Sequence, residues 1–162
     1  MRLLEVVGLA KSPALDGVSF TVEEGETVAI VGPPGSGKTT CLGCIAGAAV
    51  PDGGRVIFDG RDVTARRAGL PVPPGMALSI ARALAKRPRL LLLDDPFAGL
   101  SPEGTRSAVE RLGKLRAERL TILLATCRAT SVSALADRIV VLDRGHISDA
   151  AGAATQAWGG GR

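Results

Sequence analysis

The sequence feature that most constrains this chain is one glycine-rich loop. Residues 32–39 read Gly-Pro-Pro-Gly-Ser-Gly-Lys-Thr and match the phosphate-binding pattern G-x-x-x-x-G-K-[ST] at every fixed position. The apolar run at 27–31 predicts a buried strand before the loop, and residues 39–46 predict a helix that ends at Gly47. Glycines let successive backbone N–H groups turn toward an anion, and a helix N-terminus adds partial positive charge. We therefore expect the loop to hold a nucleoside triphosphate.

The phosphate site is expected to include the whole loop and the first helical residues. Lys38 is expected to reach the outer phosphates, and the Thr39 hydroxyl is expected to ligate a magnesium ion. The complete binding set is Gly32, Pro33, Pro34, Gly35, Ser36, Gly37, Lys38, Thr39 and Thr40.

The rest of the chain predicts alternating strands and helices. Strands are expected at 3–7, 17–22, 27–31, 55–58, 90–93, 120–125 and 138–142, and helices at 76–86, 101–118 and 131–136. The leucine run at 90–93 indicates a central parallel strand that is covered on both faces. Turns are predicted at 51–54, 59–60 and 143–145, and an irregular connection at 64–75. This order predicts an α/β domain over residues 1–148 with a mostly parallel sheet and a small antiparallel portion, followed by a flexible tail at 149–162.

Composition and charge exclude several other classes of protein. The length of 162 residues suits one domain. The net charge of +4 comes from scattered arginines without interleaved aromatic residues, so no nucleic-acid partner is expected. An odd number of cysteines does not suggest a disulfide framework and fits a reducing compartment. No apolar run has the length of a membrane span, and the early Glu5 does not fit a secretory leader, so we expect a cytoplasmic protein.

Cysteine and histidine residues are interpreted as structural. Cys41 and Cys44 lie three positions apart on the expected helix, and a packed core face is favoured over a metal or redox pair because no second ligand pair exists. His146 is the only histidine and follows a turn, so it is interpreted as a solvated surface residue and not as a catalytic one.

Two long stretches resemble the nucleotide-binding domain of ATP-binding cassette (ABC) transporters. The first begins with Leu-Asp-Gly-Val-Ser-Phe at 15–20 and continues through the phosphate loop to Asp-Gly-Arg-Asp-Val at 59–63. The second runs from Ile-Ala-Arg-Ala-Leu at 80–84 through Leu-Leu-Leu-Asp-Asp-Pro-Phe-Ala-Gly-Leu at 91–100, and closes with Ala-Asp-Arg-Ile-Val-Val-Leu-Asp-Arg-Gly at 136–145. The resemblance implies a P-loop NTPase fold with a RecA-like core, ATP and Mg²⁺ as cofactors, and a membrane permease as partner at the inner face of the membrane.

The same resemblance implies roles for two neighbouring acids. Asp94 ends a stretch that is similar to the Walker B strand of the family, so it is expected to hold the magnesium ion, directly or through water. Asp95 occupies the position of the acid, normally glutamate, that orients the attacking water. Asp95 and Lys38 are therefore the expected catalytic residues.

Departures from the family pattern fall on the catalytic parts. Asp95 is one methylene shorter than glutamate, and a misplacement of about 1 Å can cost about a hundredfold in rate. Cys127 stands where the family has a histidine that contacts the γ-phosphate, and a thiol cannot replace that group. Ser101 stands where an aspartate is expected, and no aromatic residue near Ser12 and Pro13 is available to stack on adenine.

The largest departure lies between residues 63 and 80. The family has a glutamine-bearing loop, a helical subdomain and an LSGGQ signature in this region. Counting back from residue 80 places the signature on Leu-Pro-Val-Pro-Pro at 70–74, where only the leucine matches. Proline has no backbone N–H to offer a phosphate. We therefore expect a reduced ABC-type domain without the helical subdomain, and no conventional head-to-tail homodimer.

Several functions remain open at this point. The first is an ATP-binding subunit that binds MgATP with weak or no hydrolysis and acts with a permease or with a complete ABC ATPase subunit. The second is a non-catalytic nucleotide-binding regulatory module, and a third is a decayed gene product without a role. A spacing of 94 − 38 = 56 positions between Lys38 and Asp94 also raises an AAA-like P-loop ATPase, although the flanking sequences fit the ABC pattern.

Overall fold

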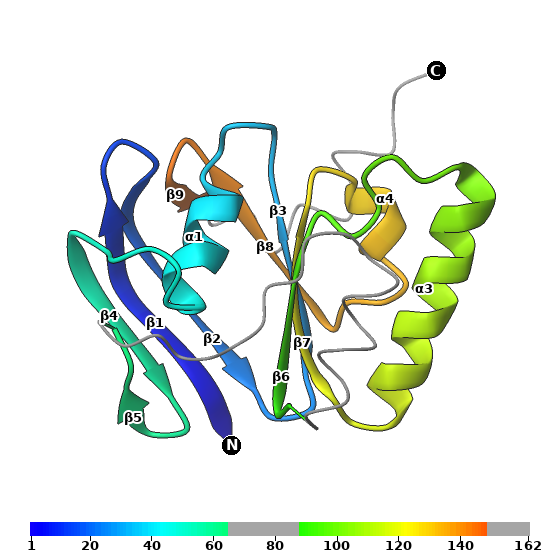
Figure 1. Ribbon diagram of the computed structural model, residues 1–162, viewed down its shortest axis with the longest axis horizontal. Coiled ribbons are helices and arrows are strands. Elements are labelled where there is room, and N and C mark those ends of the chain that lie inside the picture. Colours follow the sequence, from blue (N-terminus) through cyan, green and yellow to red (C-terminus); the bar gives the residue numbers. More distant parts are fainter. Residues whose placement is uncertain (65–87, 149–162) are drawn as a thin grey trace.

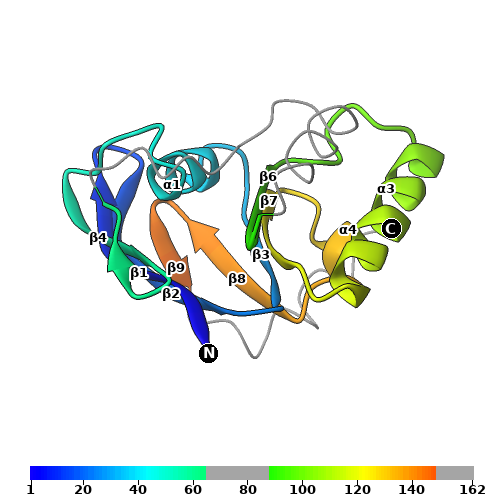
Figure 2. The ribbon, with the colours of Figure 1, turned by 60° about the horizontal axis from the view of Figure 1, so that its bottom comes forward.

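The computed structural model describes residues 1–64 and 88–148. Within these ranges the chain forms two β-sheets, and helix α1 (Lys38–Ile45) lies between them (Figure 1 and Figure 2). Helices α3 (Pro102–Ala117) and α4 (Ala129–Val132) lie on the other face of the larger sheet. The predicted α/β fold is confirmed. No helix in these ranges is long and apolar enough to cross a membrane.

The larger sheet carries the phosphate loop. Its strand order is β6 (Leu90–Asp94), β7 (Thr121–Thr126), β3 (Thr27–Val31), β8 (Arg138–Asp143) and β9 (His146–Ser148). The first four strands are parallel, and β9 pairs with β8 in the antiparallel sense. Parallel strands bring their carboxyl ends to one edge of the sheet, where ligands bind in folds of this type. The loop after β3 and the acids at the end of β6 therefore share that edge.

The smaller sheet is antiparallel. Its order is β2 (Leu15–Glu23), β1 (Arg2–Lys11), β4 (Gly53–Phe58) and β5 (Arg61–Asp62). Asp59 and Gly60 connect β4 to β5 with φ angles of 51° and 72°. Two successive residues with positive φ are what a tight hairpin turn requires. The predicted turn at 59–60 is confirmed.

Strand β3 is buried on both faces. Val28 and Ile30 belong to the core formed with α1 and the smaller sheet, whereas Ala29 belongs to the core beneath α3 and α4. A strand covered on both sides has no polar face, which explains the continuous apolar run in its sequence. The phosphate loop thus begins from a rigid, central strand.

Helix α3 begins as the sequence predicts. The Ser101 hydroxyl accepts a hydrogen bond from the Gly104 N–H at 3.0 Å, and Pro102 and Glu103 occupy the first turn. This is a helix cap followed by a proline in the position that tolerates it. Leu112 is fully buried against the larger sheet and fixes the face that the helix presents to it.

The structure differs from the prediction in the order and the ends of some elements. Strand β6 lies at one end of the larger sheet in the described part of the chain and is not central. Its leucines are nevertheless buried, because both faces of the strand are covered. An apolar run in the sequence indicates covered faces, but it does not show how many neighbouring strands pair with the strand. The predicted turn at 51–54 is shorter, because β4 already begins at Gly53; Gly54, the second residue of the strand, has φ 82°. A Cβ atom there would lie 2.3 Å from the Gly8 carbonyl oxygen, so β1 and β4 approach closely.

Short elements account for the other differences. Helix α4 covers residues 129–132 and not 131–136, and its start has no side-chain cap that the sequence could reveal. Strand β9 has only three residues and was not predicted. The predicted helix at 76–86, most of the connection at 64–75 and the tail at 149–162 lie outside the described residues.

Candidate functional site

Close backbone contacts require glycine at two positions of the loop between β3 and α1. A Cβ atom at Gly32 would lie 2.0 Å from the carbonyl oxygen of Leu142 on the neighbouring strand β8. Gly37 has φ 103°, and a Cβ atom there would lie 2.5 Å from the carbonyl oxygen of Ala14. The loop is therefore packed between β8 and the turn that joins β1 to β2.

Lys38 folds back over the loop. Its ammonium group donates hydrogen bonds to the carbonyl oxygens of Gly32 at 2.7 Å and Pro33 at 2.8 Å, and to the Ser36 hydroxyl at 3.2 Å. Ser36 is buried. These bonds hold one positive charge directly above the loop, where it can meet an anion.

Several backbone N–H groups of the phosphate loop and of the first turn of α1 have no protein acceptor among the residues that the structure describes. In the described part of the chain, no hydrogen bond joins the N–H groups of Gly35, Gly37, Lys38 or Thr39 to another protein atom. First-turn N–H groups cannot bond within their own helix. Together with the helix dipole they favour an anion at this end of α1.

The hairpin between β8 and β9 braces the same loop. The Gly145 N–H donates to the Ser36 carbonyl oxygen at 3.0 Å, and the Gly145 carbonyl oxygen accepts from the Asp16 N–H at 2.9 Å. A Cβ atom at Gly145 would lie 2.7 Å from the Ala14 carbonyl oxygen. The backbone of this hairpin therefore connects the loop to the start of β2.

A pocket of about 370 Å³ opens in front of the loop. Most of the predicted site residues line it, both those of the phosphate loop and the acids Asp94 and Asp95. Its lining is Ala14, Pro34, Gly35, Gly37, Lys38, Thr39, Thr40, Asp94, Asp95 and Cys127. Gly32, Pro33 and Ser36 do not line the pocket and instead bond the Lys38 ammonium group from within the loop.

The oxygen atoms in the pocket fit a magnesium ion shared with phosphates. Thr39 offers a hydroxyl and Asp94 a carboxylate, which are the hard oxygen ligands that Mg²⁺ prefers. In residues 1–64 and 88–148 no group of three or more His, Cys, Asp or Glu side chains could hold a metal ion by itself. Magnesium usually takes one or two protein carboxylates and completes its shell with phosphate and water. The donor set therefore fits a phosphate-bound ion better than a metal centre formed by the protein alone.

Asp95 is held at the ends of β6 and β7. Its φ angle is 43°, which is unusual for a residue other than glycine. Its N–H donates to the Ala125 carbonyl oxygen at 2.7 Å, and its carboxylate accepts a hydrogen bond from the Thr126 hydroxyl at 3.2 Å. Cys127 follows on the chain, is exposed and lines the same pocket. Asp95 and Cys127 thus lie with Asp94 and the loop residues in the lining of one pocket.

Sequence reasoning missed three contributors to the site. Ala14 lines the pocket, Gly145 braces the loop, and Thr126 bonds Asp95. Each acts through a contact between segments that are distant in the sequence, so no local pattern marks it. Ser12, near which the family resemblance implies an aromatic residue, donates its N–H to the Asp52 carboxylate at 2.8 Å.

The C-x-x-C pair lies behind the pocket in the core. Cys41 and Cys44 are both buried, which confirms their predicted packing role. Burial, followed by the proximity of Cys44, raises the pKa of the Cys41 thiol to about 12. Burial also raises the pKa of Cys44. Both side chains are therefore neutral thiols at physiological pH.

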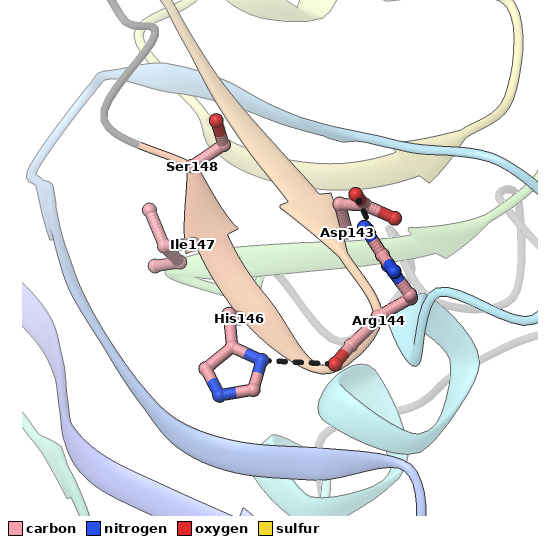
Figure 3. A pocket seen from close by; sticks show the side chains of 5 residues that line it. All are labelled: Asp143, Arg144, His146, Ile147 and Ser148. Carbon is pink, nitrogen blue, oxygen red and sulfur yellow. Dashed lines mark hydrogen bonds and ion pairs between the residues drawn. The ribbon is translucent and has the colours of Figure 1, made fainter.

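A second hollow of about 400 Å³ lies on the β8–β9 hairpin, away from the predicted site residues. Figure 3 shows Asp143, Arg144, His146, Ile147 and Ser148 around it. The His146 ring is exposed, and its Nε2 lies 3.1 Å from the Asp16 carboxylate. His146 does not line the pocket in front of the loop, which agrees with its interpretation as a surface residue.

Comparisons with known proteins agree on one family. A family model described as ABC transporter matches residues 15–72. The chain is 32% identical to the aliphatic sulfonates import ATP-binding protein SsuB 1 of Nocardia farcinica, over 90% of this chain and 80% of that protein. The chain belongs to the ATP-binding proteins of ABC transporters. This membership decides between the ABC and AAA families, which the spacing of Lys38 and Asp94 had left open.

This chain spans only part of the length of these ABC relatives. The alignment with SsuB 1 extends over 195 residues, which exceeds the 162 residues of the chain, so that relative carries segments that this chain lacks. A second relative is the methionine import ATP-binding protein MetN of Rhizobium johnstonii. It is 32% identical over 83% of this chain, but the chain spans only 55% of its length.

Solved structures show the same ABC fold. The ADP conformation of MJ1267, an ATP-binding cassette of an ABC transporter, superposes with a TM-score of 0.82 at 22% identity, over 91% of this chain and 90% of that chain. The dimeric cassette MJ0796, bound to ADP and Pi, superposes with a TM-score of 0.76 at 20% identity, over 90% of this chain and 97% of that chain. The P-loop NTPase core of an ABC cassette is therefore retained in this short chain.

Proposed function

We propose that this chain is an ATP-binding subunit that binds MgATP with weak or no hydrolysis. The observation that carries the proposal is that Lys38, Thr39, Asp94 and Asp95 line one pocket, in front of loop N–H groups that have no protein acceptor among the described residues. Lys38 and the loop amides bind the phosphates. Thr39 and Asp94 hold the magnesium ion, which neutralises phosphate charge when it is bound.

The residues at the acidic side of the pocket, Asp95 and Cys127, are the reason why we expect weak hydrolysis. Asp95 orients the attacking water in this proposal, but its carboxylate is set back by one methylene relative to glutamate. Cys127 is exposed at the position where the family has its histidine, and a thiol offers neither positive charge nor a strong hydrogen bond to a phosphate. Binding is therefore retained and turnover is slow.

The partners follow from the family and from the sequence at 70–74. Its relatives are named import ATP-binding proteins, so this chain acts in the cytoplasm at the inner face of the membrane, with a permease or with a complete ABC ATPase subunit. A complete subunit would supply the LSGGQ signature that residues 70–74 do not match. A conventional head-to-tail homodimer is not part of the proposal.

Nucleotide-dependent thermal stability tests the proposal. A ligand at about 100 times its Kd adds about 2.7 kcal/mol to stability, and each kcal/mol raises Tm by about 2–4 °C in a chain of this size. MgATP should therefore raise Tm by about 5–11 °C. Lys38→Ala should abolish the rise, whereas Lys114→Ala, which removes an exposed lysine on α3, should retain it. An unchanged Tm of the wild type in MgATP would refute the proposal.

Steady-state phosphate release tests the claim of slow turnover. We expect less than about one turnover per second, the low end of ordinary enzymes. Asp95→Glu should raise residual hydrolysis, because it restores the reach of the carboxylate. If the wild type instead turns over faster than this limit and Asp95→Asn abolishes that activity, the chain is a competent ATPase. If Asp95→Glu changes nothing, carboxylate reach does not limit the rate.

A further inference from the structure

Thr126 lies between the two sides of the pocket, one formed by the phosphate loop and the other by Asp94 and Asp95. It is fully buried at the end of β7, and its register partner on β3 is Val31, the residue before the phosphate loop. On the other side of β7, Ala125 pairs with Asp94 on β6. Thr126 is therefore located on the strand that separates the acids from the loop, although it does not itself line the pocket.

The hydrogen bonds of Thr126 have a fixed direction. The Arg128 N–H donates to the Thr126 hydroxyl oxygen at 3.1 Å, and that hydroxyl lies 3.2 Å from Oδ1 of Asp95. A backbone N–H can only donate, and an ionised carboxylate can only accept. The hydroxyl proton must therefore point to Asp95. Hydrogen bonds that share one hydroxyl reinforce each other, so the orientation of the Thr126 hydroxyl is determined on both sides.

The hydrogen bond from the Thr126 hydroxyl restricts the side chain of Asp95, a residue whose backbone is already restrained. The Asp95 N–H is bonded to Ala125, and its carbonyl oxygen accepts from the Ala98 N–H at 3.0 Å. With both backbone groups bonded, rotation about the side-chain bonds is the main freedom that remains. The Thr126 hydroxyl limits that freedom by binding Oδ1. The second carboxylate oxygen has no hydrogen bond to a protein atom among the described residues, so it is available to a water molecule.

The geometry points to Thr126 as a positioning residue for Asp95. We infer that its hydroxyl orients the carboxylate so that the free oxygen can hold a water molecule beside the terminal phosphate. This inference rests on the proposed function, because it assumes that MgATP occupies the pocket. Thr126 contributes to the arrangement of the reacting groups and not to ground-state binding of the nucleotide.

Binding of MgADP–vanadate tests the inference without requiring turnover. Vanadate with MgADP mimics the transferring phosphoryl group, and mimics of a transition state bind more tightly than ground-state ligands when the catalytic groups are positioned. Thr126→Val keeps the side-chain shape and removes the hydroxyl. It should leave the MgATP affinity within about twofold and weaken MgADP–vanadate by at least about tenfold. Thr126→Ser, which keeps the hydroxyl, should restore most of that affinity.

Thr121→Val is the matched control. Thr121 is also buried on β7, and its hydroxyl accepts a hydrogen bond from the Gly25 N–H at 2.8 Å at the other end of the strand. The control therefore removes an equivalent buried hydroxyl without touching an acid. It should leave the preference for MgADP–vanadate over MgADP unchanged. If Thr126→Val does not fold, Thr126→Ala measured in the same way should show the same selective loss.

Three outcomes would overturn the inference. In the first, the wild type binds MgADP–vanadate no more tightly than MgADP. In the second, Thr126→Val and Thr121→Val have equal effects, which would indicate a structural role only. In the third, Thr126→Val increases the vanadate affinity, which would mean that the bond holds Asp95 away from the phosphate. All three leave the thermal shift with MgATP in place, so they are distinguishable from failure of the proposed function.

Discussion

Alanine substitutions in the phosphate loop can distinguish two reasons why glycine is required there. At Gly32 the reason is steric, because an added Cβ would lie 2.0 Å from the Leu142 carbonyl oxygen. At Gly35 the reason is conformational, because φ is 78° but no atom lies within 4 Å of the added Cβ. Both reasons apply at Gly37, where φ is 103° and the Ala14 carbonyl oxygen lies 2.5 Å away. The three variants should therefore differ in a fixed order.

The expected losses of stability follow from these geometries. Gly35→Ala should cost about 1–2 kcal/mol, the penalty for an L-residue in a left-handed conformation. Gly32→Ala should cost about 3 kcal/mol, the upper end of the range for overpacking, because the obstructing atom belongs to the backbone of β8 and cannot rotate away. Gly37→Ala combines both penalties and should cost about 4–5 kcal/mol.

Thermal unfolding followed by circular dichroism measures these differences. At about 2–4 °C per kcal/mol, Gly35→Ala should lower Tm by about 2–8 °C and Gly32→Ala by about 6–12 °C. Gly113→Ala is the control, because Gly113 lies in α3 with no atom within 4 Å of an added Cβ. It should raise stability by about 1 kcal/mol. The reasoning is refuted if Gly32→Ala melts with the wild type, or if Gly35→Ala is the more damaging of the two.

Two further predictions concern the cysteines and one acid. Cys127 is exposed, whereas Cys41 and Cys44 are buried with raised pKa values, so a thiol reagent at pH 7.5 should label one site quickly in the folded chain and three after unfolding, and MgATP should slow the labelling of Cys127. Although burial opposes the shift, the hydrogen bond from Arg116 helps to lower the pKa of the Asp137 carboxyl below its usual 3.8. A carboxyl whose pKa is lower in the folded chain than in the unfolded chain stabilises the fold at pH values above its unfolded pKa, and this stabilisation is lost as the pH falls through its folded pKa. The Tm difference between the wild type and Asp137→Asn should therefore be present at pH 7 and should shrink below pH 3.8.

The sequence predicted those parts of the fold that depend on local pattern. The strand before Gly32, the helix after Gly37 and the Ser101 cap were all visible, because each is marked by neighbouring residues. The position of β6 at one end of the sheet was not visible, because hydrophobic period does not encode strand pairing. The bond between Thr126 and Asp95 was missed for a related reason, since 31 positions separate the two residues in the sequence.

The phosphate loop and the acidic side of the pocket are fixed in place by different contacts. Nucleotide binding and turnover can therefore be changed independently. The phosphate loop is fixed by backbone contacts with β8, with the β8–β9 hairpin and with the β1–β2 turn, and by hydrogen bonds from the Lys38 ammonium group to the Gly32 and Pro33 carbonyl oxygens. The acidic side depends on side chains at the ends of β6 and β7, where the Thr126 hydroxyl donates a hydrogen bond to the Asp95 carboxylate and Cys127 lines the same pocket. A substitution in the acidic side can therefore change the chemistry without moving the loop. Retention of nucleotide binding with loss of turnover requires no change in this fold.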